Sequence, residues 1–376
     1  MYQRTLSNDI VKRLGSGKAI VLLGPRQVGK TTLIKNLVGL DNYLFLDGDD
    51  PQIRALLDQP NTAEIKNIIG KNKTVFIDEA QRITNIGLTA KIIVDQIKDV
   101  QLIISGSSSF DLHNLTNEPL TGRKWEYQLY PISWEEYENE HGFLHAEQNL
   151  ENRLIFGFYP DVLNHPGDEP EILNNLLNSY LYRDLLNFSG LRKPEFLEKI
   201  ISALAFQVGN EVSYNELAQT VGIDKNTVIK YIDVLIKGFV IFKLGSYSGN
   251  LRNEIKRNQK IYFYDNGIRN AIIGDLSPIS TRQDKGALWE NFLVTERLKM
   301  NHYYKNYTKC YFWRTKQKQE VDWVEVQNQK VKGFEFKWKA KPNTKLPSTF
   351  LTSYNAESFV IDRSNFRDFI LPKSIG

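Results

Sequence analysis

Apolar runs and amphipathic segments alternate along the first third of the chain. Residues 19–23, 74–77 and 100–105 are mostly apolar, as expected of strands that are buried on both faces of a parallel sheet. Between the first two runs, apolar positions three and four apart in residues 33–38 predict an amphipathic helix. Strands that alternate with helices in this way predict an α/β domain built on a parallel sheet.

The middle of the chain has the period of helices. Apolar side chains three and four positions apart run through residues 170–187 and 196–208, which predicts a small helical bundle. Residues 213–232 then predict two short helices, capped by Ser213 and Asp224 and joined at a glycine. Two helices joined in this way indicate a helix-turn-helix.

The last third of the chain alternates apolar and polar side chains with the period of strands. Residues 311–314, 320–326 and 333–339 predict three strands. They follow a strand at residues 261–264 and a helix that begins near residue 286. This region therefore predicts a second α/β domain.

Length and composition fit a folded protein of several domains. The 376 residues are 41% hydrophobic and 24% charged, which excludes a disordered or fibrous chain. With the patterns above, we expect three domains, residues 1–165, 166–260 and 261–376. The single cysteine, Cys310, excludes an internal disulfide framework and argues against a Cys/His zinc site. No apolar run reaches 18 residues, so we expect a cytoplasmic protein with no membrane partner.

The strongest motif is the sequence GPRQVGKTT, which follows the first apolar run and precedes the first helix. It matches the phosphate-binding pattern G-x-x-x-x-G-K-[ST] in the context that this loop requires. Its two glycines let backbone amides point at phosphate oxygens, and the following helix directs its positive end at the same anion. Lys30 is expected to reach the β- and γ-phosphates, and Thr31 to ligate Mg²⁺. The residues expected to bind ATP are Gly24, Pro25, Arg26, Gln27, Val28, Gly29, Lys30, Thr31 and Thr32.

A second motif, VFIDEAQ at residues 75–81, is an apolar strand that ends in two acids. Carboxylates at the end of a buried parallel strand face the crevice where ligands of such sheets bind. We expect Asp78 to help hold Mg²⁺, and Glu79 to orient or deprotonate the attacking water. A solvated acidic loop would give the same pattern.

Two further candidate residues follow the apolar strands. The sequence SGSSS ends the third strand, where the hydroxyl of Ser107 can contact the γ-phosphate or the water. Arg123, in LTGR, can neutralise transition-state charge in its own subunit or in a neighbouring one. A serine-rich turn and a surface arginine paired with Glu126 are the structural alternatives.

Positive charge is weak overall but concentrated after residue 224. The net charge of +4 does not by itself indicate nucleic acid. Residues 235–244 predict the edge of a β-hairpin, and a basic wing follows it. The basic side chains of this region are Lys243, Arg252, Lys256, Arg257 and Lys260. We predict a winged-helix segment, whose DNA contacts are Lys225, Asn226, Thr227, Lys230, Arg252, Lys256 and Arg257. A protein docking unit or a plain connector stays open as the alternative.

The last strands bring acidic and basic side chains to one face. Alternation places Glu335 and Lys337 opposite the aromatic side chains of their strand, and Asp322 beside them on the neighbouring strand. Together with a helical Glu290, this is the metal-dependent phosphodiesterase pattern of restriction-endonuclease-like folds. We expect Glu290, Asp322 and Glu335 to hold Mg²⁺, and Lys337 to position the water or stabilise the phosphate. An ordinary half-buried strand pair makes the same pattern, so deoxyribonuclease activity stays open.

With these motifs in place, the chain resembles a widespread prokaryotic family of AAA-type P-loop ATPases that carry a C-terminal domain of unknown function. The resemblance also rests on LTGR with YPISWEE, YLYRD, YFYDNGIRNA, and EVDW with FEFKW. It implies ATP hydrolysis at Lys30, Thr31, Asp78 and Glu79, a winged-helix segment and a nuclease-like C-terminal fold. AAA-type ATPases commonly act as rings. The resemblance therefore implies a homo-oligomer such as a hexamer, with Arg123 acting on a neighbouring subunit.

Three functions are compatible with these features. The first is an ATP-driven motor or remodeller of DNA, for which forked or branched DNA is a suitable substrate. The second is a nucleotide-operated switch that binds a protein partner. The third keeps DNA binding but has no catalysis at Asp322, so that the last domain only grips DNA. We prefer the first.

Overall fold

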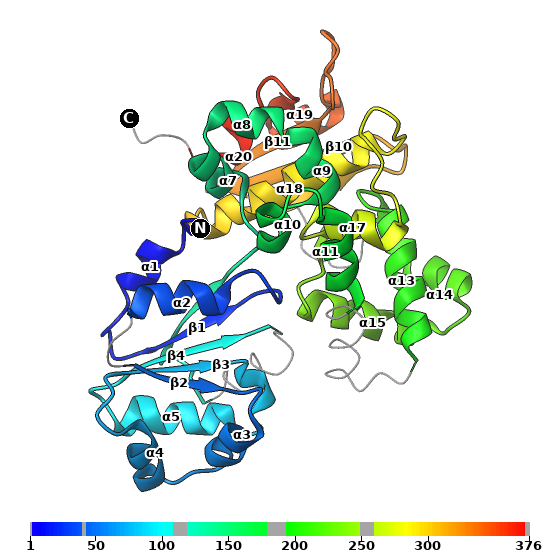
Figure 1. Ribbon diagram of the computed structural model, residues 1–376. Helices are drawn as coiled ribbons and strands as arrows, with labels where there is room; N and C mark the ends of the chain where they lie inside the picture. The colour runs from blue at the N-terminus through cyan, green and yellow to red at the C-terminus, as the bar shows by residue number, and fades with distance from the viewer. Residues whose placement is uncertain (1, 40–42, 108–118, 179–192, 249–258, 373–376) are drawn as a thin grey trace. The chain divides into compact units, whose positions relative to one another are not determined.

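The computed structural model describes residues 2–39, 43–107, 119–178, 193–248 and 259–372 (Figure 1). The chain forms two compact units. Unit 1 comprises residues 1–132 with 237–239, and unit 2 comprises residues 133–236 with 240–376. No helix in these described ranges is long and apolar enough to cross a membrane.

Unit 1 is built on a five-stranded parallel sheet with the strand order β2–β3–β4–β1–β5. The strands are β1 (Ala19–Leu23), β2 (Tyr43–Asp47), β3 (Thr74–Asp78), β4 (Gln101–Gly106) and β5 (Lys124–Gln128). All five residues of β1 are buried, as the continuous apolar run predicted. The expected parallel α/β domain is confirmed.

Helices cover both faces of this sheet. Figure 1 shows α1 and α2 on one side of it and α5 with α4 on the other. The helices are α1 (Ser7–Val11), α2 (Lys30–Val38), α3 (Pro51–Leu57), α4 (Thr62–Ile69), the short 3₁₀ helix Ala80–Arg82 and α5 (Ile86–Gln96). Because the strands are parallel, the carboxyl ends of β1, β3 and β4 meet at one edge of the sheet. That edge carries the candidate nucleotide site.

Unit 2 begins with helices and contains two smaller sheets. Its helices are α7 (Trp134–His141), α8 (Phe143–Gln148), α9 (Leu150–Phe156), α10 (Pro160–Asn164), α11 (Glu169–Leu176), α13 (Pro194–Phe206), α14 (Tyr214–Val221), α15 (Lys225–Lys237), α17 (Asn266–Ile273), α18 (Lys285–Tyr303), α19 (Ser348–Tyr354) and α20 (Phe366–Ile370). The predicted helix at residues 170–187 corresponds to α11, and its part from residue 179 onward, with the YLYRD motif, lies outside the described residues.

The first sheet of unit 2 has three antiparallel strands in the order β6–β8–β7. They are β6 (Glu211–Val212), β7 (Ile241–Leu244) and β8 (Gln259–Phe263). The two predicted short helices are present as α14 and α15, separated by Gly222 with φ of 77°. The hairpin edge begins later than we predicted, because α15 continues to Lys237.

The second sheet of unit 2 has the order β12–β11–β10–β9. Its strands are β9 (Lys309–Arg314), β10 (Glu320–Gln327), β11 (Lys330–Phe336) and β12 (Glu357–Ile361). The three predicted strands are present, but the third begins at Lys330 and ends at Phe336, so Lys337 lies just beyond its end. β12 adds a parallel fourth strand beside β11. Asn328 and Gln329, both with positive φ, form the tight turn between β10 and β11.

A buried aromatic cluster joins the start of unit 2 to its last helices. Trp134 of α7 packs edge-on against Phe292 of α18 and Phe366 of α20, with ring centroids 5.9 and 5.4 Å apart. Trp289 of α18 also packs against Phe366, with ring centroids 5.4 Å apart. These contacts lie within unit 2, which begins at Ser133.

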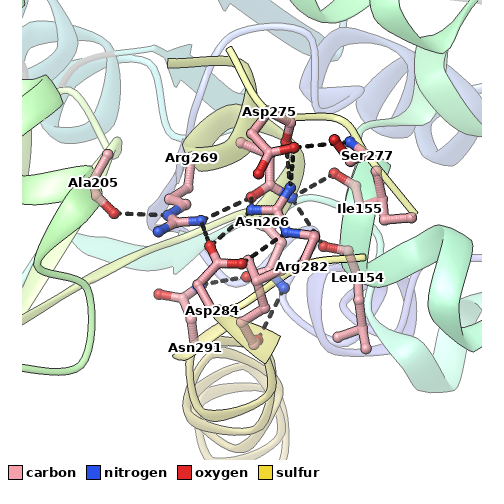
Figure 2. Close-up of polar contacts among 12 residues, drawn as sticks. Leu154, Ile155, Ala205, Asn266, Arg269, Asp275, Ser277, Arg282, Asp284 and Asn291 are labelled. Carbon is pink, nitrogen blue, oxygen red and sulfur yellow. Dashed lines mark hydrogen bonds and ion pairs between the residues drawn. The ribbon is translucent and has the colours of Figure 1, made fainter. Parts of the chain in front are cut away.

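A buried polar network connects α17 to α9, to α13 and to the segment that begins α18 (Figure 2). Asn270 donates to the carbonyl oxygens of Leu154 and Ile155 at 3.2 and 2.8 Å. Arg269 donates to the carbonyl oxygen of Ala205 at 2.7 Å and pairs with Asp284. These contacts fix α9, α13 and α17 to the segment that begins α18, so helices on both sides of the predicted boundary at residue 260 lie in one unit. The division into three domains stays a prediction.

Candidate functional site

The loop after β1 has the tight backbone that phosphate binding requires. Gly24 lies against β5, since a Cβ atom there would come within 2.1 Å of the carbonyl oxygen of Leu129. Gly29 has φ of 90° and precedes the first residue of α2. Both glycines therefore occupy positions that other residues would strain. The first turn of α2 points its free amides at the same loop.

Lys30 lies in this loop with only 5% of its surface exposed. Its Nζ donates to the carbonyl oxygens of Gly24 at 2.9 Å and Pro25 at 2.7 Å. Burial lowers the pKa of Lys30 to about 8, although the nearby Glu79 and Asp78 charges oppose that shift. A buried ammonium group whose hydrogen bonds go to neutral oxygens is suited to an incoming anion such as a phosphate.

Asp78, at the end of β3, accepts hydrogen bonds from two hydroxyl groups. Thr31 Oγ1 donates to Asp78 Oδ2 at 2.5 Å, and Ser105 Oγ on the adjacent strand β4 donates to Asp78 Oδ1. Strand order and register thus bring together the two predicted Mg²⁺ residues from positions 47 apart in the sequence. A hydroxyl and a carboxylate are oxygen ligands of the kind that Mg²⁺ takes beside nucleotide phosphates, so these residues fit that ion.

Glu79 follows directly, in a left-handed conformation with φ of 46°. Its Oε2 accepts hydrogen bonds from Gln81 Nε2 at 2.6 Å and from Ser107 Oγ at 3.0 Å. Arg26 of the phosphate loop approaches the same oxygen at 3.9 Å. The predicted candidate Ser107 is therefore in contact with the predicted base.

Some residues at this edge were missed by the sequence reasoning. Gln81 is the last residue of the VFIDEAQ motif, but the motif did not indicate that its side chain would contact Glu79. Arg4 carries no motif, yet it is 7% exposed and donates to the carbonyl oxygens of Val28 at 2.7 Å and Tyr130 at 2.6 Å. Arg4 thus holds the phosphate loop to the end of β5, and only the folded chain reveals it.

Arg123 lies away from the nucleotide site within its own unit. It precedes β5, and its carbonyl oxygen accepts from the amide of Ala19 at the amino end of β1. The phosphate loop follows the opposite end of that strand. Arg123 pairs with Asp95 at 2.6 Å rather than with Glu126. From this position Arg123 does not reach the nucleotide site of its own unit, so its predicted role in a neighbouring subunit is the one to test.

The predicted DNA-contacting side chains of α15 are mostly exposed. Lys225, Asn226 and Lys230 lie on the surface. Thr227 is half-buried, and its amide and hydroxyl both donate to Asp224, which lowers the pKa of that carboxyl. The hydroxyl of Thr227 therefore helps to cap the amino end of α15. Arg252, Lys256 and Arg257 lie outside the described residues.

The inclusion of Lys260 in the basic wing was wrong, because its side chain is fully buried. Lys260 is on β8, where it shares a strand face with Tyr262. Its Nζ lies 2.9 Å from Glu290 Oε1, 2.5 Å from Glu320 Oε1 and 4.0 Å from Asp322 Oδ1. Burial alone would lower the pKa of Lys260, but the surrounding carboxylates raise it well above its ordinary value.

The predicted nuclease-like residues lie around this lysine. Burial, and then the charge of Glu290, raise the pKa of Asp322 well above its ordinary value, and Glu335 adds to the shift. Asp322 Oδ2 accepts from the amide of Phe336 at 2.7 Å. Glu335 Oε1 pairs with Lys337 at 2.5 Å. The sequence pattern thus identified neighbours in space.

This acid cluster does not fit a divalent metal as it stands. The ammonium group of Lys260 lies among the carboxylates that a metal would need. Across the described residues, no group of three or more His, Cys, Asp or Glu side chains has an arrangement that could hold a metal ion. The expected roles of Glu290, Asp322 and Glu335 as metal ligands therefore have no geometric support.

Comparison with known families matches three segments of the chain. Residues 16–138 match an AAA domain, and residues 285–370 match a domain of unknown function, DUF4143. Residues 147–278 match another domain of unknown function, DUF8612. The chain thus has a P-loop AAA ATPase domain and a C-terminal DUF4143 domain.

Two bacterial proteins described as uncharacterized are similar in sequence to this chain. A protein of Mycobacterium tuberculosis is 27% identical over 349 residues, which cover 91% of this chain and 75% of that protein. A protein of Haemophilus influenzae is 25% identical, with 68% of this chain and 69% of that protein covered.

Solved structures match weakly. A signal transduction ATPase with numerous domains from Pyrococcus horikoshii is 12% identical with a TM-score of 0.31, over 81% of this chain and 48% of that one. The chain thus spans about half the length of that protein. Drosophila ORC bound to DNA and Cdc6 is 10% identical with a TM-score of 0.28, over 72% of this chain and 89% of that one.

Proposed function

We propose that this protein is an ATP-hydrolysing AAA-type remodeller of DNA, with ATP turnover in unit 1 and DNA contact through α15 of unit 2. One observation carries the ATPase part: Lys30, Thr31, Asp78 and Glu79 converge at one edge of the parallel sheet, beside a glycine loop. The AAA domain match over residues 16–138 supports the same conclusion.

The residues of unit 1 have distinct roles in this proposal. Lys30 exchanges its carbonyl partners for the β- and γ-phosphates, since its hydrogen bonds in the loop go to neutral oxygens. Bound Mg²⁺ neutralises charge on the phosphate oxygens, and Thr31 and Asp78 are the residues that would hold it. Glu79 orients the attacking water and accepts its proton, while Ser107 and Gln81 keep that carboxylate at the site.

Steady-state ATP hydrolysis tests the ATPase part. Lys30→Ala and Glu79→Gln should each lower the turnover about 100-fold or more, because each removes a group that acts on the transition state. Lys35→Ala is the matched control, since Lys35 is exposed on the same helix and lies over the ring of Phe45. Full turnover in Lys30→Ala would contradict the assignment.

The DNA part rests on the element order of unit 2. Among the described residues, the elements come in the order α13–β6–α14–α15–β7–β8, with residues 249–258 between β7 and β8 outside the description. The outer strands β6 and β7 both pair with β8. This order is typical of a winged helix, in which the second helix of the turn contacts DNA. Lys225, Asn226 and Lys230 are exposed on that helix, where they suit phosphates and base edges.

DNA binding at several salt concentrations tests this part, with duplex, forked and four-way-junction DNA. Lys225→Glu with Lys230→Glu should weaken binding and flatten the salt dependence by about one unit per lost phosphate contact. Lys199→Glu on α13 is the control, because Lys199 is exposed but lies outside α14 and α15. An unchanged salt slope in the double variant would remove α15 from the DNA contact. Arg252, Lys256 and Arg257 are the second set to replace.

An exposed apolar side chain supports a second candidate function. Ile229 lies between the polar residues of α15 and is 37% exposed. A protein partner bound at α15 would cover this side chain, as a nucleotide-operated switch predicts. The switch predicts ATP turnover that is indifferent to every DNA form, and partner capture that Lys30→Ala abolishes. Stimulation of turnover by one DNA form would exclude it in favour of the remodeller.

Self-association completes the proposal. In a homo-oligomer such as a hexamer, Arg123 of one subunit would act on the nucleotide of its neighbour. Mixing Arg123→Ala subunits with Glu79→Gln subunits tests this, because each variant supplies what the other lacks. Recovered turnover in the mixture supports the arrangement. A monomer by light scattering in ATP and DNA, with full activity of Arg123→Ala, contradicts it.

A further inference from the structure

One lysine of unit 2 lies where a nuclease-like site would hold its metal. Lys260 is 0% exposed, and its Nζ is within 2.9 Å of the carboxylates of Glu290 and Glu320. Asp322 follows at 4.0 Å. These acids come from α18 and β10, and the lysine reaches them from β8.

We propose that Lys260 is the built-in cation of this acid cluster and that it replaces a divalent metal there. An ammonium group placed among carboxylates offsets their mutual repulsion and satisfies their oxygens with hydrogen bonds. A divalent ion would have to displace that group from a fully buried position. The cluster is therefore closed to metal, and the last domain works without metal-dependent cleavage.

Other oxygens of the cluster also have hydrogen-bond partners. Glu290 Oε1 accepts a second hydrogen bond from Tyr262 at 2.7 Å. The carboxylate of Glu290 lies against Gly209, where an added Cβ would come within 3.2 Å of it. Asp322 Oδ2 is taken by a backbone amide of β11. Glu335 Oε2 is buried without a hydrogen-bond partner, so the closure of the cluster to metal rests on the place of Lys260 and not on saturation of every oxygen.

Charge balance supports the same inference. Four acids meet in this region, Glu290, Glu320, Asp322 and Glu335. The three basic side chains that pair with them are Lys260, Lys337 and Arg314. Arg314 also pairs with Glu211, and the side chains of Lys337, Arg314 and Glu320 are partly exposed, so Lys260 is the fully buried cation of this set. Removing Lys260 would leave the buried acids without their central cation.

Mn²⁺ binding by paramagnetic resonance, without nucleotide, tests the proposal on the full chain. Wild type and Asp322→Asn should give the same binding curve, because the cluster holds no metal and the substitution leaves unit 1 unchanged. Lys260→Met should bind one Mn²⁺ ion more than wild type binds. An Mn²⁺ ion bound by wild type and lost in Asp322→Asn would overturn the proposal.

The matched control is Lys337→Met, the same change at a lysine on the edge of the cluster. Lys337 is 44% exposed and its Nζ pairs with Glu335. It should therefore bind Mn²⁺ like wild type. An additional ion in Lys337→Met as well as in Lys260→Met would mean that any lost charge opens the site, and the special place of Lys260 would be refuted.

A second variant guards against misfolding of Lys260→Met. Lys260→Met with Glu320→Gln keeps the three acids of the nuclease-like pattern and removes one surplus negative charge. Circular dichroism establishes that each variant is folded. A folded variant that gains no Mn²⁺ contradicts the proposal, and a rise in melting temperature with added Mn²⁺, absent in wild type, supports it.

Discussion

Two of the buried lysines of this protein, one in each unit, have opposite surroundings. Lys30 of unit 1 donates to two neutral carbonyl oxygens, and burial lowers its pKa to about 8. Lys260 of unit 2 lies among carboxylates, which raise its pKa well above the ordinary value. The first ammonium group lacks a directly bonded anion, whereas the second has several.

This difference separates a binding site from a structural one. A buried charge that is hydrogen-bonded only to neutral groups keeps part of its desolvation cost, and an anionic ligand can relieve it. A buried charge that is fully compensated gains nothing from a ligand. Both regions hold acids next to a lysine, and both matched catalytic patterns in the sequence. The partners of the lysine, rather than the pattern, decide which one is ready for a ligand.

The largest expected effect is on the stability of unit 2. Lys260→Met should lower the free energy of unfolding by about 3–5 kcal/mol, because removing one partner of a buried ion pair leaves the other charges uncompensated. Urea denaturation followed by tryptophan fluorescence measures this, since Trp134 and Trp289 are in the core of unit 2. Unchanged stability would mean that the acids rearrange without cost, and the contrast with Lys30 would disappear.

The second effect concerns the response of unit 1 to ATP. At a concentration 100 times its Kd, ATP with Mg²⁺ should stabilise wild type by about 2.7 kcal/mol. Lys30→Met should lose that stabilisation while its own stability stays at or above that of wild type, because the removed buried charge is compensated only in part by the nearby Glu79 and Asp78. Differential scanning fluorimetry with and without nucleotide measures both quantities. A variant that is strongly destabilised without ATP would show that Lys30 is compensated after all.

The sequence predicted the nucleotide site far better than the acid cluster. Residues 24–32 are contiguous, so one local pattern contains the loop, Lys30 and Thr31, and an apolar strand that ends in Asp78 supplies the rest. The parallel sheet then brings these parts together at one edge. Local chemistry and fold agree, and the pattern was sufficient.

Lys260 could not be assigned in the same way, because its partners come from distant segments. It follows a basic stretch and so suggests a solvated wing, yet strand β8 is covered on both faces and turns Lys260 inward with Tyr262. The alternation of side chains along β8, which puts Lys260 on the same face as Tyr262, was the one sequence feature that indicated its burial. Arg4 had none, since its role depends on carbonyl oxygens 24 and 126 residues away.

The third effect is smaller because the residue is less buried. Glu320 is 28% exposed and bridges Lys260 at 2.5 Å and Arg314 at 3.5 Å. Glu320→Gln should lower the free energy of unfolding by about 1–2 kcal/mol, since it weakens a charged hydrogen bond but leaves Glu290 beside Lys260. Arg314 keeps Glu211 at 3.4 Å. If Glu320→Gln lowered the free energy of unfolding as much as Lys260→Met does, Glu320 alone would compensate the charge of Lys260.

The smallest effect is expected at Lys337, and it sharpens the comparison within the acid cluster itself. Lys337 pairs with Glu335 at 2.5 Å but is 44% exposed, so solvent screens the pair. Lys337→Met should change the free energy of unfolding by less than about 1 kcal/mol, measured by the same urea denaturation. Two lysines of one cluster would then differ severalfold in their contribution to stability because one is buried among acids and the other is solvated. An equal loss at both positions would show that proximity to the acids, and not burial, sets the contribution of each lysine.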